Sequence, residues 1–77
     1  MKTYVFQVEV EEDKDGRWSA TCPTLQGCAT WGRTREDALR NIREAVEGYV
    51  EDLIATGEPI PGAREILDSP AVSVVAA

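Results

Sequence analysis

Five carboxylates crowd one short stretch near the N-terminus and are the first residues in the chain that could do chemistry. They are Glu9, Glu11, Glu12, Asp13 and Asp15. Carboxylates can bind Mg²⁺, and a pair of them can act as general acid and base. On a strand, however, Glu9 and Glu11 share one face while Glu12 points to the other. A solvated acidic hairpin is therefore the favoured interpretation, and a magnesium site is the alternative.

Two cysteines, Cys22 and Cys28, form the second candidate group. The chain has no histidine and no second cysteine pair that would complete the four ligands of a zinc site. Without an export signal, two reduced, half-buried thiols are favoured over a disulfide or a metal site. The missing histidine also removes the Ser-His-Asp and Cys-His arrangements of nucleophilic catalysis. We therefore expect neither enzyme activity nor a cofactor.

Arginines and one tryptophan surround the start of a predicted helix. A helix N-terminus attracts anions, so Arg33 and Arg35 could contact a phosphate or a carboxylate; surface ion pairs with the neighbouring acids are the favoured interpretation. Tryptophan is enriched at binding hot spots, although in a small core it is more often simply packed. The candidate partner-binding residues are Trp31, Arg33, Arg35, Thr24 and Gln26.

The elements that must position these residues follow from the spacing of the apolar side chains. Apolar residues at alternate positions predict a strand over residues 4–11 and a returning strand over residues 17–22, joined by a turn at residues 13–16. Pro23 stops the second strand because proline cannot donate to the ladder. A third short strand is predicted over residues 28–32.

A long amphipathic helix is the most strongly indicated element. Thr34 is a suitable N-cap, and the acidic residues in the next turn, Asp37 among them, favour the positive end of a helix. Apolar residues then recur at spacings of three and four as far as Ile54. Gly57 is a natural stop, and the proline that follows prevents continuation.

This order of elements, β-β-β-α-β, predicts a two-layer α+β fold in a single domain over residues 1–77. One helical turn at residues 63–67 and a final strand at residues 71–76 complete it. The long helix is expected to cover one face of an antiparallel-rich sheet. That face is predicted to be lined by Tyr4, Phe6, Val8, Trp18 and Ala20.

The final strand is a candidate oligomer edge. It is β-prone and uncharged, and such an edge invites pairing with another chain. Through Val72, Val74 and Val75 we expect either a homo-oligomer or the addition of a partner's strand. The alternative is an internal strand with neighbours on both sides.

Composition favours a protein partner over a nucleic acid. The 77 residues carry a formal charge of −6, and strong phosphate binding depends on Lys and Arg, so direct DNA binding is not expected. An acidic protein suits a basic partner, although a mild acidic charge also serves solubility alone. No apolar run reaches the ~18 residues that cross a bilayer, and the N-terminus lacks the basic flank of a signal peptide. We expect a cytoplasmic protein without membrane contact.

An ordered series of short motifs runs through the first three quarters of the chain. It comprises Tyr4, Gly16 with Trp18, Pro23-x-Leu25-x-Gly27-Cys28, Thr30-x-Gly32-x-Thr34, Glu36-Asp37-Ala38-Leu39 with Asn41, Ala45, and the segment at residues 58–61. In this series the chain resembles the HicB-like antitoxin family. The resemblance implies a fold likened to a truncated ribonuclease H core and, as partner, a HicA-type toxin, which is a small basic RNA-binding protein.

Two departures qualify the resemblance. Thr24 and Arg33 stand where many relatives carry an acid. Full-length antitoxins usually add a C-terminal DNA-binding domain, and a chain that ends at Ala77 leaves no room for one, so operator binding is not expected.

The leading hypothesis is an antitoxin-like binding module that oligomerises and occludes the surface of a basic toxin. One alternative is a degenerate ribonuclease-H-like hydrolase that uses Glu9, Glu11 and Asp13 with Mg²⁺. The other is a protein that keeps only the fold and self-association.

Overall fold

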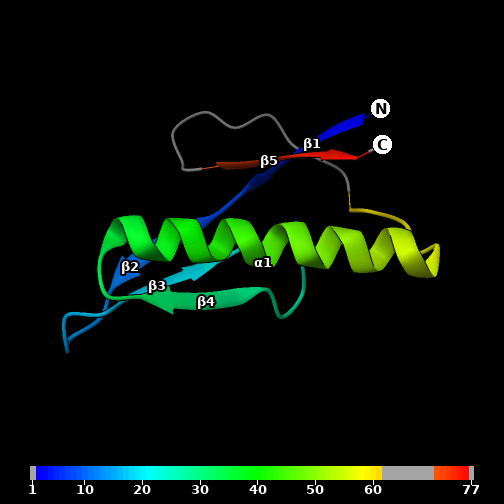
Figure 1. The fold of residues 1–77 in the computed structure, drawn as a ribbon. Coiled ribbons are helices and arrows are strands. Elements are labelled where there is room, and N and C mark those ends of the chain that lie inside the picture. Colours follow the sequence, from blue (N-terminus) through cyan, green and yellow to red (C-terminus); the bar gives the residue numbers. More distant parts are fainter. Residues whose placement is uncertain (1, 62–70, 77) are drawn as a thin grey trace.

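The predicted α+β fold with one long helix and antiparallel strands is confirmed by a computed structural model, which describes residues 2–61 and 71–76. Figure 1 shows the helix lying across the strands. The elements are, in chain order, β1 (Lys2–Gln7), β2 (Glu9–Glu12), β3 (Trp18–Thr21), β4 (Ala29–Gly32), α1 (Arg35–Thr56) and β5 (Ala71–Ala76). The final strand lies where the sequence predicts it. The helical turn predicted at residues 63–67 falls outside the described residues.

The first predicted strand is broken in two at Val8, and each half has its own partner. β1 pairs antiparallel with β5, from Lys2↔Ala76 to Gln7↔Ala71. β2 pairs antiparallel with β3, which in turn pairs with β4. Buried and exposed side chains continue to alternate across the break, so that Phe6 and Val8 are both buried.

The helix begins and ends where the sequence predicts. Thr34 is the N-cap, and its Oγ1 accepts a hydrogen bond of 3.1 Å from the backbone N–H of Asp37. At the other end Gly57 adopts φ 74°, a left-handed conformation that glycine reaches without steric cost. Its N–H donates to the carbonyl of Ile54, and the next N–H donates to that of Leu53.

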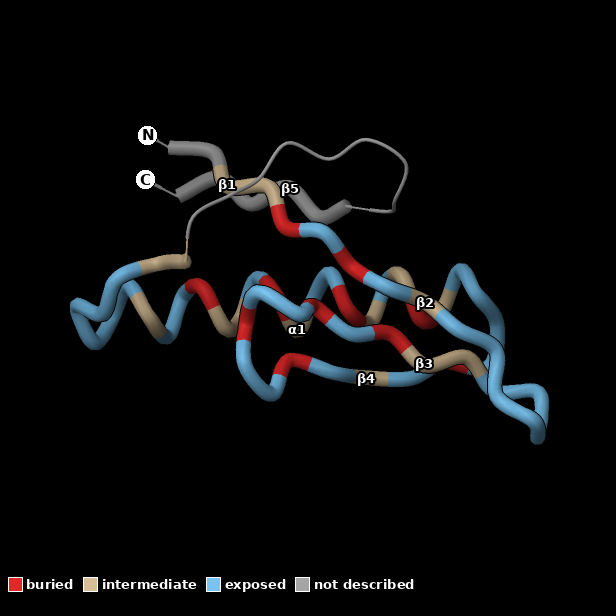
Figure 2. The backbone as a smooth tube through the Cα atoms, turned by 180° about the vertical axis from the view of Figure 1, so that it is seen from behind, coloured by how far each residue is buried: buried red, intermediate tan, exposed pale blue. Residues whose placement is uncertain are grey.

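The core lies between the helix and the inner faces of the strands. Buried helix residues recur every four positions, which puts them on one face of the helix, and Figure 2 marks them as red segments of α1. Trp18, predicted to line this face, is half-buried and packs against the buried cluster. That cluster consists of Phe6, Val8, Ala20, Cys22, Leu25, Cys28, Ala38, Ile42, Val46 and Val50.

Helix α1 packs closely on β4 because the strand ends in a glycine. A Cβ built on Gly32 would lie 2.8 Å from the carbonyl carbon of Asp37 and closer still to the amide nitrogen of Ala38. Both of these are backbone atoms that cannot swing aside. Only glycine therefore lets the strand and the first turns of the helix approach this closely. None of the described helical residues belongs to an apolar segment of the kind that spans a bilayer.

Candidate partner-binding surface

Trp31 lies on the face of the three-stranded sheet that the helix leaves uncovered. Residues directly opposite one another in antiparallel strands share a face. The register sets Trp31 opposite Ser19, and Ser19 opposite Glu11. Glu9, Thr21 and Ala29 form a second such row. With these small or short neighbours beside it, Trp31 remains 52% exposed, although tryptophans in small proteins are more often packed.

Trp31 is exposed because of the residue that follows it. Successive residues of a strand point to opposite faces. Gly32 must face the helix, because no side chain fits between β4 and the backbone of α1 at that position. Trp31 therefore has to face away from the helix, although its hydrophobic ring would favour burial.

The Arg17 side chain lies over one face of the Trp31 ring. Its guanidinium carbon lies 5.3 Å from the centre of the Trp31 ring, within the range of a cation–π contact. Asp15 anchors this arginine from the hairpin turn, with an ion pair of 3.1 Å to Nε and a hydrogen bond of 3.2 Å from the Arg17 backbone N–H. Both side chains are more than half exposed, so the pair adds little stability and acts mainly on orientation.

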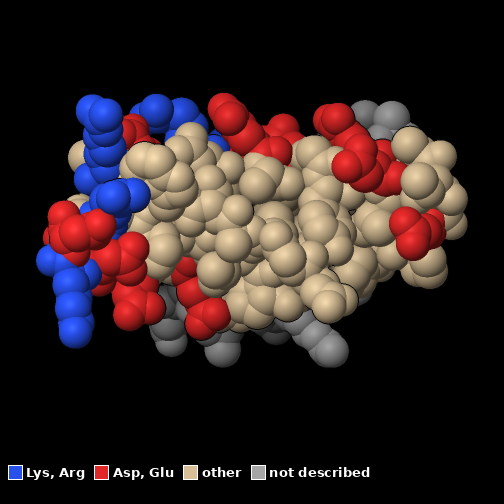
Figure 3. Space-filling model, turned by 90° about the horizontal axis from the view of Figure 1, so that it is seen from below, with Lys and Arg blue, Asp and Glu red and all other residues tan. Residues whose placement is uncertain are grey.

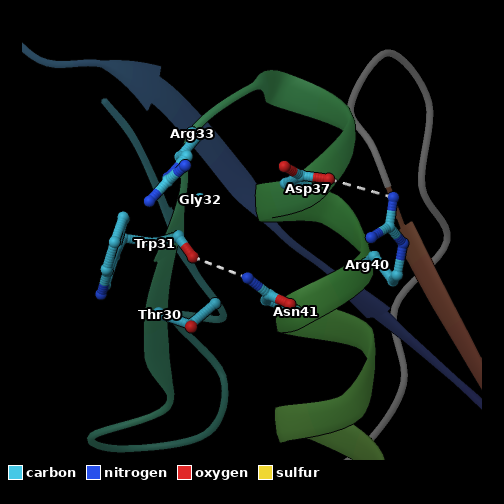
Figure 4. Close-up of a pocket in the computed structure, with 7 residues that line it drawn as sticks. All are labelled: Thr30, Trp31, Gly32, Arg33, Asp37, Arg40 and Asn41. Carbon is cyan, nitrogen blue, oxygen red and sulfur yellow. Dashed lines mark hydrogen bonds and ion pairs between the residues drawn. The ribbon is translucent and has the colours of Figure 1, made fainter. Parts of the chain in front are cut away.

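Arg33 and Asn41 lie next to Trp31 on opposite sides of β4, Arg33 away from the helix and Asn41 on the helix side (Figure 4). Figure 4 shows the side chains of Trp31 and Arg33 turned away from the helix, while Asn41 reaches towards the strand from α1. The Asn41 amide donates a hydrogen bond of 2.8 Å to the carbonyl oxygen of Trp31. Arg33 has no ion pair within the described part of the chain. A shallow surface hollow of about 400 Å³ lies beside this contact between strand and helix, and its lining also includes Arg40, which is paired with Asp37 at 3.0 Å.

The five residues proposed from the sequence are only partly brought together. Trp31 and Arg33 lie side by side at the end of β4. Thr24 and Gln26 are exposed in the turn that precedes β4, at the other end of that strand, and Arg35 is exposed as the first residue of α1. Sequence reasoning missed Arg17 and Asn41. The position of Arg17, two residues before Ser19 on the same face, is a signal that could have found the first of them.

The acidic residues considered for chemistry are spread along the first hairpin. Glu9 and Glu11 are exposed on the uncovered face, and Asp13 lies in the turn, where its N–H donates to the Arg17 carbonyl at 2.6 Å. Among residues 2–61 and 71–76, no three His, Cys, Asp or Glu residues come together as metal ligands. The two glutamates add negative charge to the sheet face that carries Trp31, two strands away from it.

The cysteines are free thiols inside the turn between β3 and β4. Both are buried, and the N–H of Cys22 donates to the carbonyl of Cys28 at 2.9 Å. Burial raises the pKa of the Cys22 thiol, against the opposing effect of hydrogen bonds from the Leu25 and Thr24 backbone. Burial also raises the pKa of Cys28, and the nearby Cys22 raises it further. Protonated thiols are poor nucleophiles, so these side chains serve as small apolar core residues.

Charge is distributed unevenly along the molecule. Figure 3 shows Lys and Arg gathered at the end formed by the hairpin and the start of α1, with only Asp and Glu towards the opposite end. The sequence explains this, because residues 44–61 contain no Lys or Arg. Acids near a helix C-terminus oppose the helix dipole, and the last turn of α1 has no basic residue to offset them. The acidic stretch consists of Glu44, Glu47, Glu51, Asp52 and Glu58.

Relatives with similar sequences occur in bacteria and archaea. A UPF0150 protein of Synechocystis is 47% identical over 58 residues, which are 75% of this chain and 73% of that protein. A UPF0150 protein of Thermoplasma acidophilum is 41% identical over 56 residues, 73% of this chain and 81% of that protein.

Two solved structures share the fold. The crystal structure of the N-terminal domain of the Burkholderia pseudomallei antitoxin HicB matches with a TM-score of 0.74 and 28% identity, over 95% of this chain and 98% of that domain. The B. pseudomallei antitoxin HicB itself matches with a TM-score of 0.74 and 32% identity, over 92% of this chain but 58% of HicB. The sequence model of the family described as "HicB_like antitoxin of bacterial toxin-antitoxin system" matches residues 6–72. The chain therefore belongs to the HicB-like antitoxin family.

Proposed function

We propose that the chain neutralises a small, basic HicA-type toxin by covering the toxin's RNA-binding or catalytic surface. Membership in the antitoxin family implies a toxin partner. The observation that carries the proposal is the exposed Trp31 ring on the uncovered sheet face, with the Arg17 guanidinium over the ring. Tryptophan and arginine are the residues that most often carry binding energy at protein interfaces.

Geometry favours the uncovered sheet face over other surfaces. The helix covers the inner face, so a partner can reach the strands only from outside. Around Trp31 the neighbours Ser19 and Ala29 are small, which leaves room for a partner's side chains to pack around the ring. Arg17 is already held by Asp15, so little side-chain entropy is lost when a partner binds.

Charge complementarity supports a basic partner. Glu9 and Glu11 lie on the same face as Trp31, and the net charge of the chain is −6. Cationic groups of a toxin would meet these carboxylates at the rim, where charges speed association and reject wrong partners more than they add affinity. We expect association to slow as the salt concentration rises.

The test is the affinity of the full chain for the toxin encoded beside its gene. We expect Trp31→Ala to weaken binding by about 30-fold or more in calorimetry, because truncation of a hot-spot residue costs about 2 kcal/mol or more. The same variant should no longer stop RNA cleavage by the toxin. Ile54→Ala is the matched control, since Ile54 is also a large exposed apolar residue, 48% exposed, but lies near the far end of α1.

The comparison between the two variants decides the outcome. Unchanged affinity for Trp31→Ala, together with loss for Ile54→Ala, would move the interface from the sheet to the helix. A neighbouring toxin that the wild-type chain neither binds nor inhibits would overturn the proposed function altogether.

A further inference from the structure

Two thiols face each other at the end of the β3–β4 hairpin. The register that closes with Thr21↔Ala29 brings Cys22 opposite Cys28, and the Cys22 N–H donates to the Cys28 carbonyl at 2.9 Å. Residues directly opposite in antiparallel strands share a face, and both side chains belong to the buried cluster. The Cα atoms of such a hydrogen-bonded pair lie about 5.5 Å apart, and disulfides join Cα atoms that are about 4.4 to 6.8 Å apart. The backbone therefore already has the spacing of a disulfide.

The thiols can be reached from the surface through the turn that joins them. A hollow of about 260 Å³ opens at this turn, and both cysteines line it together with the exposed residues Pro23, Gln26 and Gly27. A hollow of this size admits several molecules as small as water. Cys28 is 7% exposed, against 1% for Cys22. A small oxidant therefore meets Cys28 first.

We propose that Cys22 and Cys28 form a modification site, at which a hydroperoxide oxidises the two thiols to an intrachain disulfide across the turn. The inference goes beyond the proposed toxin binding and does not depend on it. In the reduced chain the two side chains fill the core. In the oxidised chain they fix the turn that leads into β4. Both states fit the same fold, because the two residues are already opposite each other before oxidation.

The reaction takes two steps. The Cys28 sulfur attacks one oxygen of hydrogen peroxide, the O–O bond breaks, and the other oxygen leaves as water with the thiol proton, so that Cys28 becomes a sulfenic acid. The Cys22 sulfur then attacks the Cys28 sulfur, the S–O bond breaks, and the hydroxyl leaves as water with the Cys22 proton. The two sulfurs give up two electrons in total, and the peroxide is reduced to two water molecules.

The surroundings of Cys22 suit it to the second step. The backbone N–H groups of Leu25 and Thr24 donate hydrogen bonds to the Cys22 sulfur, and such bonds stabilise the thiolate that attacks. Burial still raises the pKa of both thiols, so the first step is slow at neutral pH. The reduced pair therefore persists until peroxide accumulates.

The disulfide closes a ring of seven residues, 22–28. A cross-link of this kind stabilises a protein mainly because it removes conformations from the unfolded chain. Since the paired backbone needs little rearrangement, we expect the ratio of folded to unfolded chain to rise about tenfold. The Tm should rise by about 5 °C or more.

The experiment treats the full chain with excess hydrogen peroxide at pH 8 and follows the tryptic peptide 18–33 by mass spectrometry. This peptide holds both cysteines and no methionine. Its mass should fall by two hydrogens, it should resist alkylation, and dithiothreitol should restore both thiols. In Cys22→Ala a sulfenic acid should accumulate at Cys28, where dimedone traps it. In Cys28→Ala the trapping of Cys22 should be several-fold slower, because Cys22 is the less exposed thiol.

A control variant separates reaction in the folded chain from reaction in the unfolded chain. Asn41→Ala removes a hydrogen bond at the other end of β4 and should raise the unfolded fraction about fivefold. At low micromolar concentration this variant should still be oxidised at the wild-type rate, because the peroxide enters through the hollow.

A peptide that keeps both free thiols, or one that gains oxygen at a single cysteine while the other stays a thiol, would overturn the proposal. So would oxidation about fivefold faster in Asn41→Ala, since the thiols would then react only in the unfolded chain. A disulfide that leaves the Tm unchanged would also contradict it, since the turn would then not be constrained. None of these readouts involves the toxin, so this inference and the proposed toxin binding can fail separately.

Discussion

β4 and β5 are both outer strands of their sheets, but they differ in length and in what packs against them. β4 has four residues, ends at a glycine pressed against the helix, and has its Trp31 carbonyl occupied by the Asn41 amide. β5 has six residues, carries no charge, and has no second strand beside it among the described residues. The comparison teaches that an outer strand is protected by what packs against it. β4 has an exposed face at Trp31, whereas β5 has an edge that no other described strand pairs with.

The two strands belong to different sheets, β4 to the three-stranded sheet and β5 to the two-stranded one, so the two exposed features lie in different parts of the domain. The face around Trp31 depends on side chains, which carry specificity. The edge of β5 depends on backbone hydrogen bonds, for which an uncharged sequence is sufficient.

The largest expected effect comes from breaking the contact between β4 and the helix. Gly32→Ala should lower the free energy of unfolding by about 3 kcal/mol, because the new Cβ would overlap backbone atoms of Asp37 and Ala38. Gly48→Ala is the matched control, since that glycine lies within α1 with open space around it. It should stabilise the chain by about 0.5–1 kcal/mol.

Urea denaturation of both variants measures this difference. If Gly32→Ala were as stable as the wild type, the close approach of strand and helix would not be what orients β4, and the explanation for the exposed Trp31 would fail with it.

A smaller effect is expected when the amide that covers β4 is removed. Asn41→Ala leaves the Trp31 carbonyl without its partner and should cost about 1 kcal/mol of unfolding free energy. Asn41→Asp should cost more, because a carboxylate would face the carbonyl oxygen. Arg43→Ala, an exposed change on the same helix, should stay within about 0.5 kcal/mol of the wild type.

The same variants sharpen the contrast between the two outer strands. If Asn41 keeps β4 from pairing, Asn41→Ala should form species larger than the wild type at high concentration, as seen by sedimentation. An unchanged mass would show that packing of the helix alone protects this strand.

The smallest effect concerns the turn that leads into β4 and appears only at alkaline pH. The pKa values of Cys22 and Cys28 are raised in the folded chain, so the unfolded chain loses these protons first as the pH rises. Below about pH 8 both states are protonated and the thiols add no pH dependence. Above that pH the free energy of unfolding should fall, by at most about 1.4 kcal/mol per pH unit for each thiol.

Thermal unfolding between pH 7 and 10 tests this expectation against the Cys22→Ala, Cys28→Ala double variant. The double variant should be less stable at neutral pH, but its free energy of unfolding should change less between pH 7 and 10. If the stability of the wild type and that of the double variant fall equally with pH, the thiols are not buried in the folded state.

Much of the fold could be predicted because its signals are local. The apolar spacing of α1, the Thr34 cap and the Gly57 stop depend on residues within a few positions of one another, and the structure confirms all three. The break at Val8 carries no such signal. It arises because β2 pairs with β3 while β1 pairs with β5, a strand more than sixty residues away in the chain.

The candidate site was predictable only in its residue types. Trp31 and Arg33 stand out in the sequence as unusual neighbours of a helix start. The contacts of Arg17 and Asn41 with Trp31 join residues that are 14 and 10 positions apart, and they exist only once the strands are in register. Thr24 and Gln26 are near Trp31 in the sequence, but they lie at the other end of β4.

By itself the sequence determined the helix, the order of the strands apart from the break at Val8, the buried stripe of the helix and the acidic character of the chain, because side-chain period and charge are properties of neighbouring residues. Only the tertiary structure decided that Trp31 faces outward, that the Asn41 amide covers the Trp31 carbonyl of β4, and that β1 is the one described strand that pairs with β5. The physical reason is the close approach of helix and strand at Gly32. One missing side chain there fixes which way its neighbours point, and spacing along the chain does not specify that contact.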